Sequence, residues 1–349
     1  MWVRIFKNIK SEYNPSMHVY AQQLLKYMPS NVDDFSVKAK NYHFLRYYFA
    51  KEFVYPKEAA KNQADVNHIS DHSYSGLLRG LDPEKTAVTC HDIIPLIDIG
   101  AISWLGKKRF WFNVKLMPKA KKIIAVSEFT KGLVLEKFRN ISRDKISVIP
   151  YGVDETFRPV EQKEALRQKY NISKKSVLHV GSSYPRKNVE LILEILTKRK
   201  DWQFVKVGPF SKRQCSYIRK NNLNKRILHF PRIDLNEREK LTEVYNSVSV
   251  LAYPSFYEGF GMPVLEAMAC GCPVVCSDIP PFFEIAEGSA VFVDPKNAKL
   301  FEHSVDKIFE DAEFRLRSIQ EGFCKAKHYS WKDSAEKTYK IYEEIYRAE

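Results

Sequence analysis

The sequence lacks several features that would place it in common protein classes. Its 349 residues contain no run of about 18 uncharged apolar residues, so no membrane-spanning helix is predicted. The first residues, MWVRIFKNIKSEY, have no apolar signal-peptide core. The six cysteines form no CxxC pair, and Cys270, Cys272 and Cys276 lie among apolar residues without a nearby histidine. These absences predict a cytoplasmic protein with buried, reduced thiols and no zinc site.

Charge is abundant and unevenly distributed. The net charge is +14, and residues 101–150 hold 12 Lys or Arg against 3 Asp or Glu. Such a surplus favours an anionic partner, and nucleic acid, a phosphorylated ligand and an acidic membrane all satisfy it. The length exceeds what one compact core accommodates and predicts two domains.

Strand-like and helix-like segments alternate along both halves of the chain. In the first half, WVRIF, TAVTCHDIIPL, KKIIAVS and KISVIPYG have the continuous apolar character of buried parallel strands. In the second half, SVLHVGSS, FVKVG, RILHF, VSVLAYPS, PVVCS and AVFVD repeat the pattern. We therefore expect an α/β protein with Rossmann-like domains at 1–157 and 158–330. The apolar face of 331–349 predicts a helix that returns to the first domain.

The segment YPSFYEGFGMPVLEAMACGCPVVCSD, residues 253–278, places two carboxylates beside a tight turn. Pro263 suits the first turn of a helix, and Gly259 and Gly261 lie in the loop before it. The amides of a helix N-terminus bind anions such as phosphate, whereas carboxylates accept hydrogen bonds from vicinal hydroxyls. Taken alone, Glu258 is typical of a solvated loop and Glu266 of a charge near a helix start. Together they indicate a ligand with both sugar and phosphate, a nucleotide sugar.

The segment EGFGMPVLEAMACGCPVV resembles the signature of glycosyltransferase family 4, the group 1 retaining glycosyltransferases of the GT-B fold. Five further segments match the family in order: VTCHDIIPL, IIAVSEFTK, ISVIPYGVDETF, HVGSSYPRKN and YSWKDSA. The resemblance implies two Rossmann-like domains that face each other across a cleft. It implies a hexosyltransferase that moves a sugar from a nucleoside-diphosphate sugar to a glycan or lipid-linked acceptor. HDIIPL and PRKN favour GDP-mannose slightly, and hence mannosyl transfer.

The resemblance also implies roles for residues of the second half. Glu266 would hold the ribose hydroxyls of the donor, and Glu258 would contact hydroxyls of the transferred sugar. The backbone of Gly259, Phe260, Gly261 and Met262 would surround that sugar. Arg186 and Lys187 would face the diphosphate and neutralise the charge of the leaving group.

Three further assignments come from the resemblance. His91 would lie near the reacting sugar. Ser182 stands where many members carry an arginine, so Arg186 would supply more of the diphosphate contact. Ser16 would be the small residue near the donor, because the segment after the first strand lacks the glycine-rich loop common in the family.

No metal or other cofactor is expected. The sequence contains no Asp-x-Asp pair to hold a divalent ion, and the family's GT-B enzymes use cationic side chains in its place. Residues 104–122 interleave seven Lys or Arg with aromatic and aliphatic residues and contain no acidic residue. This pattern fits peripheral binding at the inner face of an anionic membrane and fits equally a helix whose aromatics pack in the core.

Two other functions use parts of the same sequence. A GT-B sugar-nucleotide epimerase would share the fold but does not account for all six matching segments. A basic nucleic-acid-binding protein would use the cationic surplus, but the sequence has no helix-turn-helix, zinc-finger or aromatic RNA-binding motif. Nucleic acid is therefore not expected as a partner.

Overall fold

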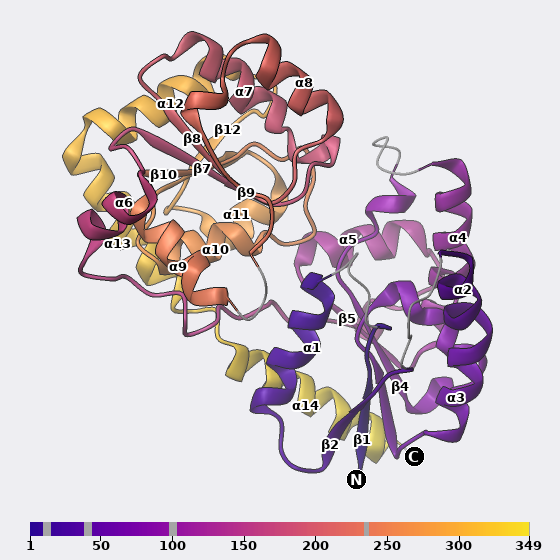
Figure 1. Ribbon diagram of the computed structural model, residues 1–349. Coiled ribbons are helices and arrows are strands. Elements are labelled where there is room, and N and C mark those ends of the chain that lie inside the picture. Colours follow the sequence, from indigo (N-terminus) through magenta and orange to yellow (C-terminus); the bar gives the residue numbers. More distant parts are fainter. Residues whose placement is uncertain (10–14, 38–43, 98–102, 234–236, 349) are drawn as a thin grey trace. The chain divides into compact units, whose positions relative to one another are not determined.

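The computed structural model describes residues 1–9, 15–37, 44–97, 103–233 and 237–348. The chain divides into two compact units, the first made of Met1–Gly152 with Ser330–Glu349 and the second of Val153–Tyr329. Within the described residues each unit contains one six-stranded sheet whose pairings are parallel. The α/β class predicted from the alternating segments is confirmed (Figure 1).

The sheet of the first unit has the strand order β2-β1-β3-β4-β5-β6. Its strands are β1 (Val3–Phe6), β2 (Val32–Phe35), β3 (Val66–Ile69), β4 (Thr86–Cys90), β5 (Lys122–Ala125) and β6 (Ile146–Val148). Its helices are α1 (Pro15–Tyr27), α2 (Phe44–Phe49), α3 (Tyr55–Lys61), α4 (Trp104–Val114), α5 (Glu128–Lys137) and α14 (Trp331–Arg347). A π-helical turn, η1 (Ala50–Val54), joins α2 to α3, and short 3₁₀ turns are η2 (His72–Arg79), η3 (Pro83–Lys85), η4 (Ile94–Leu96), η5 (Met117–Lys119) and η6 (Arg143–Lys145).

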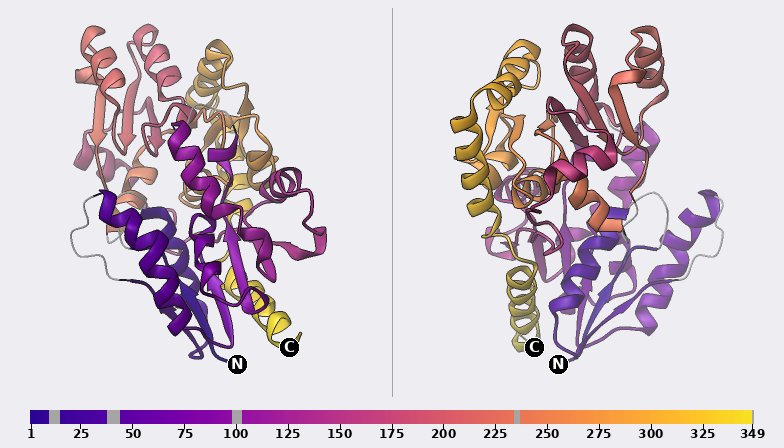
Figure 2. Two further views of the ribbon diagram at one scale, coloured as in Figure 1. Left: turned by 90° about the vertical axis from the view of Figure 1, so that its right-hand side faces the viewer. Right: turned by 60° about the vertical axis from the view of Figure 1, so that its left-hand side comes forward.

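Side chains of the first sheet alternate between two buried faces. One face packs against α1 and α14, where Ile341, Tyr342 and Ile345 meet Val3 and Ile124. The other face packs against η1, α3, η2, α4 and α5. The C-terminal helix thus returns to the first unit, as the sequence predicts, and the two ends of the chain lie close together in every view (Figure 2).

The second sheet has the strand order β12-β11-β10-β7-β8-β9. Its strands are β7 (Ser176–Val180), β8 (Gln203–Val207), β9 (Ile227–Phe230), β10 (Val250–Tyr253), β11 (Val274–Ser277) and β12 (Val291–Val293). Its helices are α6 (Lys163–Tyr170), α7 (Val189–Lys198), α8 (Lys212–Lys220), α9 (Arg238–Ser247), α10 (Met262–Ala269), α11 (Pro280–Ala286), α12 (Ala298–Glu310) and α13 (Ala312–Ala326), with 3₁₀ turns η7 (Pro185–Lys187) and η8 (Asn224–Arg226).

This strand order is that of a doubly wound nucleotide-binding sheet. Successive strands are added on one side of β7 and then, from β10 onwards, on its other side, so the strand order reverses between β7 and β10. In open α/β sheets, ligands bind beyond the carboxyl ends of the strands at such a reversal. Beyond β7 the chain continues through Ser182 to Arg186 and Lys187, and beyond β10 it continues to Glu258. The fold therefore brings these segments to the same point of one sheet.

Candidate functional site

The loop after β7 carries the two cations. Arg186 and Lys187 lie in η7, which ends at Asn188 in the left-handed conformation, with φ of 51°. The Asn188 side chain donates to the Pro295 carbonyl oxygen at 2.8 Å, and the Arg186 carbonyl accepts from the amide of Phe256 at 2.8 Å. These bonds fix the loop against the segments after β12 and β10, and both cations face the same carboxylate.

That carboxylate is Glu258. Its Oε1 accepts from the Lys187 ammonium at 2.5 Å, and its Oε2 accepts from Arg186 at 2.9 Å. Lys187 also donates to the Tyr253 hydroxyl at 2.6 Å, and both Lys187 and Glu258 are 7% exposed. Burial alone would raise the pKa of Glu258, but attraction from Lys187 and Arg186 lowers it to about 2. The site therefore holds a permanently ionised carboxylate between two cations.

The residues after Glu258 lead directly into a helix. Gly261 caps α10 with φ of 120°, and a Cβ at this position would lie 2.7 Å from the Phe282 ring. Only glycine tolerates that conformation and that contact. Gly259 and Phe260 are buried, and Met262 begins the helix with Pro263 in its first turn. The loop is thus a narrow backbone path next to the ion cluster.

Glu266 lies on the same helix in a different electrostatic setting. Its Oε2 accepts from the Tyr245 hydroxyl at 2.8 Å. Burial raises the pKa of Glu266 to about 7, although the Tyr245 hydrogen bond and the nearby Arg238 act to lower it. The two glutamates therefore differ: Glu258 is ionised at every physiological pH, whereas Glu266 titrates near neutrality. Two carboxyl groups whose pKa values differ in this way can serve different roles in one site.

Lys206 is a cation of this region that the sequence reasoning did not single out. It lies on β8 with no solvent exposure, and its ammonium donates to the carbonyl oxygens of Gly181 at 2.5 Å and Val207 at 2.7 Å. A Cβ at Gly208 would lie 2.1 Å from the Gly181 oxygen, so the two loops touch here. Burial, with repulsion from Lys187, lowers the pKa of Lys206 to about 7. The available signal was a lysine inside the otherwise apolar run FVKVG.

His91 follows β4 in the first unit. It is 3% exposed, and burial lowers its pKa to about 4 despite attraction from Asp71. Its Nε2 lies 2.7 Å from the Ser70 carbonyl oxygen, so this nitrogen carries the hydrogen. Nδ1 of the neutral ring then accepts from the Tyr151 hydroxyl. Contact between His91 and a sugar would require one of these bonds to be exchanged.

Other polar residues gather at the carboxyl edge of the first sheet. Its strand order reverses between β1 and β3, and Asn8 and Asp71 follow these two strands. The Asn8 amide donates to Asp71 at 2.6 Å, and the amide of His91 donates to His72 Nδ1 at 3.3 Å. Burial opposes ionisation of Asp71, but attraction from His72, His91 and Lys51, with the Asn8 hydrogen bond, lowers its pKa to about 2. Neither Asp71 nor Tyr151 was among the residues predicted from the sequence.

The structure says less about two of the predicted site residues, Ser182 and Ser16. Ser182 is half-buried in the loop after Gly181. Ser16 lies in the first turn of α1, and its side chain is outside the part of the chain that the structure describes. The roles assigned to the predicted site residues stay predictions.

Each of the two units matches a known protein family. Residues 17–157 match the family described as Glycosyltransferase Family 4, and residues 162–323 match that described as Glycosyl transferases group 1. A curated relative, O-antigen chain mannosyltransferase B from Escherichia coli, is 26% identical over 244 residues, or 65% of this chain and 61% of that protein. The chain thus aligns with about three-fifths of this relative's length.

Solved structures share the fold along the whole chain. Sucrose-phosphate synthase from Thermosynechococcus elongatus superposes with a TM-score of 0.80 at 19% identity, and 100% of each chain is covered. HepE from Anabaena, in complex with UDP and glucose, gives 0.78 at 14% identity, covering 98% of this chain and 99% of that one. At these identities the likeness shows the GT-B fold alone. From the family matches to both units, the chain belongs to the group 1 glycosyltransferases, glycosyltransferase family 4.

Proposed function

We propose that this protein is a retaining, metal-independent glycosyltransferase that transfers mannose from GDP-mannose to a glycan or lipid-linked acceptor. The observation that carries the proposal is the ion cluster of Glu258, Arg186 and Lys187 at the strand-order reversal of the second sheet. A nucleotide sugar presents both a diphosphate and hydroxyl groups, and this cluster offers cations for the first and a carboxylate for the second.

Donor binding exchanges partners within the cluster. The diphosphate takes the Arg186 and Lys187 cations, and Glu258 gains hydroxyls of the sugar as new hydrogen-bond donors. The exchange limits the cost of removing the buried carboxylate from its counter-charges. Glu266, next to Tyr245, accepts the ribose hydroxyls. These steps assign the two glutamates to the two sugars of the donor.

Transfer then breaks the bond between the anomeric carbon and the diphosphate oxygen. The acceptor oxygen forms its new bond on the same face of the sugar and passes its proton to the leaving phosphate oxygen, so configuration is retained. The cations stabilise the negative charge that develops on the diphosphate, in the role that a metal ion has in other transferases. His91, in the first unit, is the residue that the family resemblance assigns to the surroundings of the reacting sugar.

Mannose as the transferred sugar is supported by the relative named an O-antigen chain mannosyltransferase. The HepE complex contains UDP and glucose, so UDP-glucose is the competing donor to compare with GDP-mannose. The name of O-antigen chain mannosyltransferase B supports a glycan chain as the acceptor. The lipid linkage of that acceptor and a location at the inner face of a membrane are proposed from the sequence resemblance. Among the described residues, none of the helices has the length and apolarity needed to cross a bilayer.

A thermal-shift screen with GDP, UDP and ADP and their sugars tests the donor. A ligand at about 100 times its Kd should stabilise the protein by about 2.7 kcal/mol, and we expect the largest shift with GDP-mannose. Transfer to lipid-linked glycan should then survive EDTA. The anomeric ¹H–¹³C coupling of the product reports whether the α configuration of GDP-mannose is kept. Stabilisation by none of the nucleotide sugars, or activity that EDTA abolishes and a divalent ion restores, contradicts the proposal.

A further inference from the structure

The structure divides the basic, aromatic segment 104–122 into a buried and an exposed part. Val114 and Met117 have no solvent exposure and belong to the core of the first unit. Lys121 and Lys122 pair with Glu84 and Glu344. The exposed part lies on helix α4 before its buried last residues, where Trp104 is 69% exposed and Leu105, Trp111 and Phe112 are also exposed. Within 104–122, the exposed aromatic side chains that a partner could contact therefore lie on this helix.

A second segment, which the sequence reasoning did not identify, extends the same surface. Phe49 ends α2 and is 61% exposed, and Phe53 lies in η1 with its ring centre 5.3 Å from that of Phe49. The two segments touch through side chains. The Asn113 amide donates to Glu52 at 2.6 Å, and the Arg109 guanidinium lies 4.6 Å from the centre of the Tyr48 ring.

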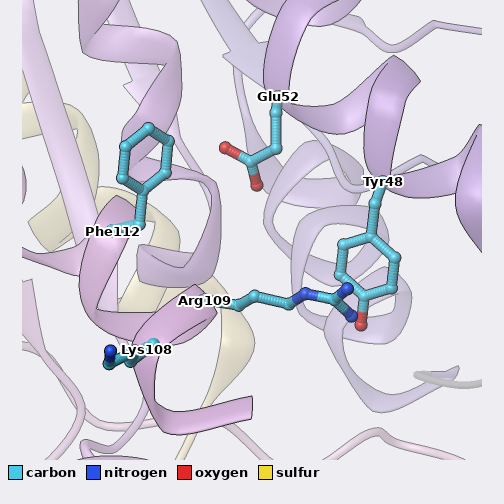
Figure 3. Close-up of a pocket in the computed structure, with 5 residues that line it drawn as sticks. All are labelled: Tyr48, Glu52, Lys108, Arg109 and Phe112. Atoms are coloured by element: carbon cyan, nitrogen blue, oxygen red, sulfur yellow. The ribbon is translucent and has the colours of Figure 1, made fainter. Parts of the chain in front are cut away.

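A pocket of about 220 Å³ lies where the two segments meet. Figure 3 shows Arg109 reaching from α4 towards Tyr48, with Glu52 across the gap and Phe112 further along the helix. Glu52 accepts from both Asn113 and Arg79, at 2.6 Å and 3.3 Å. Its charge is thereby compensated within the protein.

Apart from the compensated Glu52, the charge of this surface is positive. Helix α4 contains Lys107, Lys108 and Arg109 and no acidic residue, and Lys115 follows at its end. The Lys108 ammonium lies 3.8 Å from the centre of the Trp104 ring, so cation and exposed aromatic are adjacent. Exposed aromatics interleaved with cations match the boundary of an anionic bilayer, which takes rings below the headgroups and cations among the phosphates. Double-stranded nucleic acid would use the cations and leave these rings in water.

We propose that Phe49, Phe53, Trp104, Leu105, Lys108 and Phe112 form a docking face for the surface of an anionic membrane, here called the aromatic–basic face. It deepens the proposed function, because a transferase that acts on lipid-linked acceptors works at such a surface. The face is made by two chain segments rather than one helix. Loss of Phe49 and Phe53 should therefore weaken binding although they lie outside the basic segment.

Flotation of the intact protein with phosphatidylcholine vesicles, with and without phosphatidylglycerol, tests the face. We expect binding to the anionic vesicles only, weakened by salt. Lys108→Gln and Lys115→Gln should each lower the partition coefficient about fivefold. Phe49→Ser with Phe53→Ser should lower it about tenfold or more.

Matched controls lie on the second unit. Lys212→Gln and Lys220→Gln each remove one charge from an exposed position of α8, and Leu300→Ser with Leu316→Ser removes exposed apolar side chains of α12 and α13. None of these variants should change vesicle binding by more than about twofold. The donor-induced thermal shift of each variant, measured in parallel, reports separately on the proposed donor site.

Three outcomes would overturn the inference: no binding to anionic vesicles, equal losses in the control variants, or a phenylalanine double variant that turns a dimer into a monomer and leaves vesicle binding unchanged. The last would assign the face to a second copy of the chain. A normal donor shift without vesicle binding would refute the docking face and leave the proposed transferase standing.

Discussion

Glu266 should make donor binding depend on pH in a way that can be calculated. Its pKa is about 7 in the donor-free protein, against an ordinary value of 4.5. The ionised carboxylate is the better acceptor for the two ribose hydroxyls, so binding favours the charged form and lowers the pKa. If the hydroxyls restore the ordinary value, affinity should rise about 30-fold between about pH 5.5 and pH 8.5.

The same shift predicts a release of protons. At about pH 6.5, about three quarters of the Glu266 carboxyls are protonated before binding and almost none after it, so binding should release about 0.75 proton. At about pH 8.5 almost no release is expected. Calorimetry in two buffers with different ionisation enthalpies measures this number directly. An intact nucleotide sugar is the right ligand, because its diesterified diphosphate does not titrate in this range.

Glu266→Gln is the decisive control. The variant should bind the donor more weakly above pH 7, with a flat pH profile and no proton release. Lys206 also has a pKa near 7, but a diphosphate nearby would raise it and cause proton uptake, the opposite sign. Release that persists in Glu266→Gln, or uptake in the wild type, would refute the assignment of Glu266 to the ribose.

The ion cluster and Lys206 lead to the other predictions. Lys187→Ala should lower kcat roughly 10²–10³-fold at saturating donor, with exposed Lys220→Ala as the control, and turnover like the wild type would remove Lys187 from the diphosphate site. Glu258→Gln should weaken binding of the intact donor and spare the free nucleotide, and calorimetry showing equal losses of both would contradict the division of roles. Because the folded pKa of Glu258 lies below its ordinary value, its contribution of about 3 kcal/mol is fully present above pH 4.5 and is lost as pH falls towards 2. Denaturant unfolding should therefore show the wild type and Glu258→Gln converging over that range, and a gap that stays constant would show that the ion pairs do not cause the shift. Lys206→Met should raise the KM for the nucleotide sugar about tenfold with little change in kcat, because the Gly181 carbonyl loses its hydrogen-bond donor. If Lys206→Arg restores the KM, Lys206 has a positioning role. If neither variant changes the KM, that role is excluded.

Most strands were predictable because buried strands of a parallel sheet consist of short runs of apolar residues, such as SVLHV and VLAY. The two strands that were missed, β2 and β3, have the sequences VDDF and VNHI. In β3, Asn67 and His68 have no solvent exposure, and His68 bonds to the Tyr342 hydroxyl at 2.6 Å. That partner comes from the last helix, so no local pattern could mark His68 as buried.

The sequence predicted which residues lie in the candidate site but not the hydrogen bonds and ion pairs between them. Arg186, Lys187 and Glu258 follow strands, and strand ends of a doubly wound sheet meet at one edge. Sequence reasoning assigned the cations to the diphosphate and the carboxylate to the sugar, and it did not anticipate that they pair with one another. Lys206 was missed because its ammonium bonds to the carbonyl oxygen of Gly181, a residue of another segment that the sequence does not place beside it.

The return of α14 to the first unit sets an order for folding during synthesis. The described strands of the first sheet are all made by Val148, but one face of that sheet is covered by Ile341, Tyr342 and Ile345, which are translated after the whole second unit. At 5–20 residues per second, about 10–40 s separate the two events. The second unit is continuous in sequence and can fold in this interval, whereas the first waits with apolar strand residues uncovered. Nascent chains stalled before α14 should therefore recruit chaperones through the first unit, and supplying α14 as a separate peptide should release them.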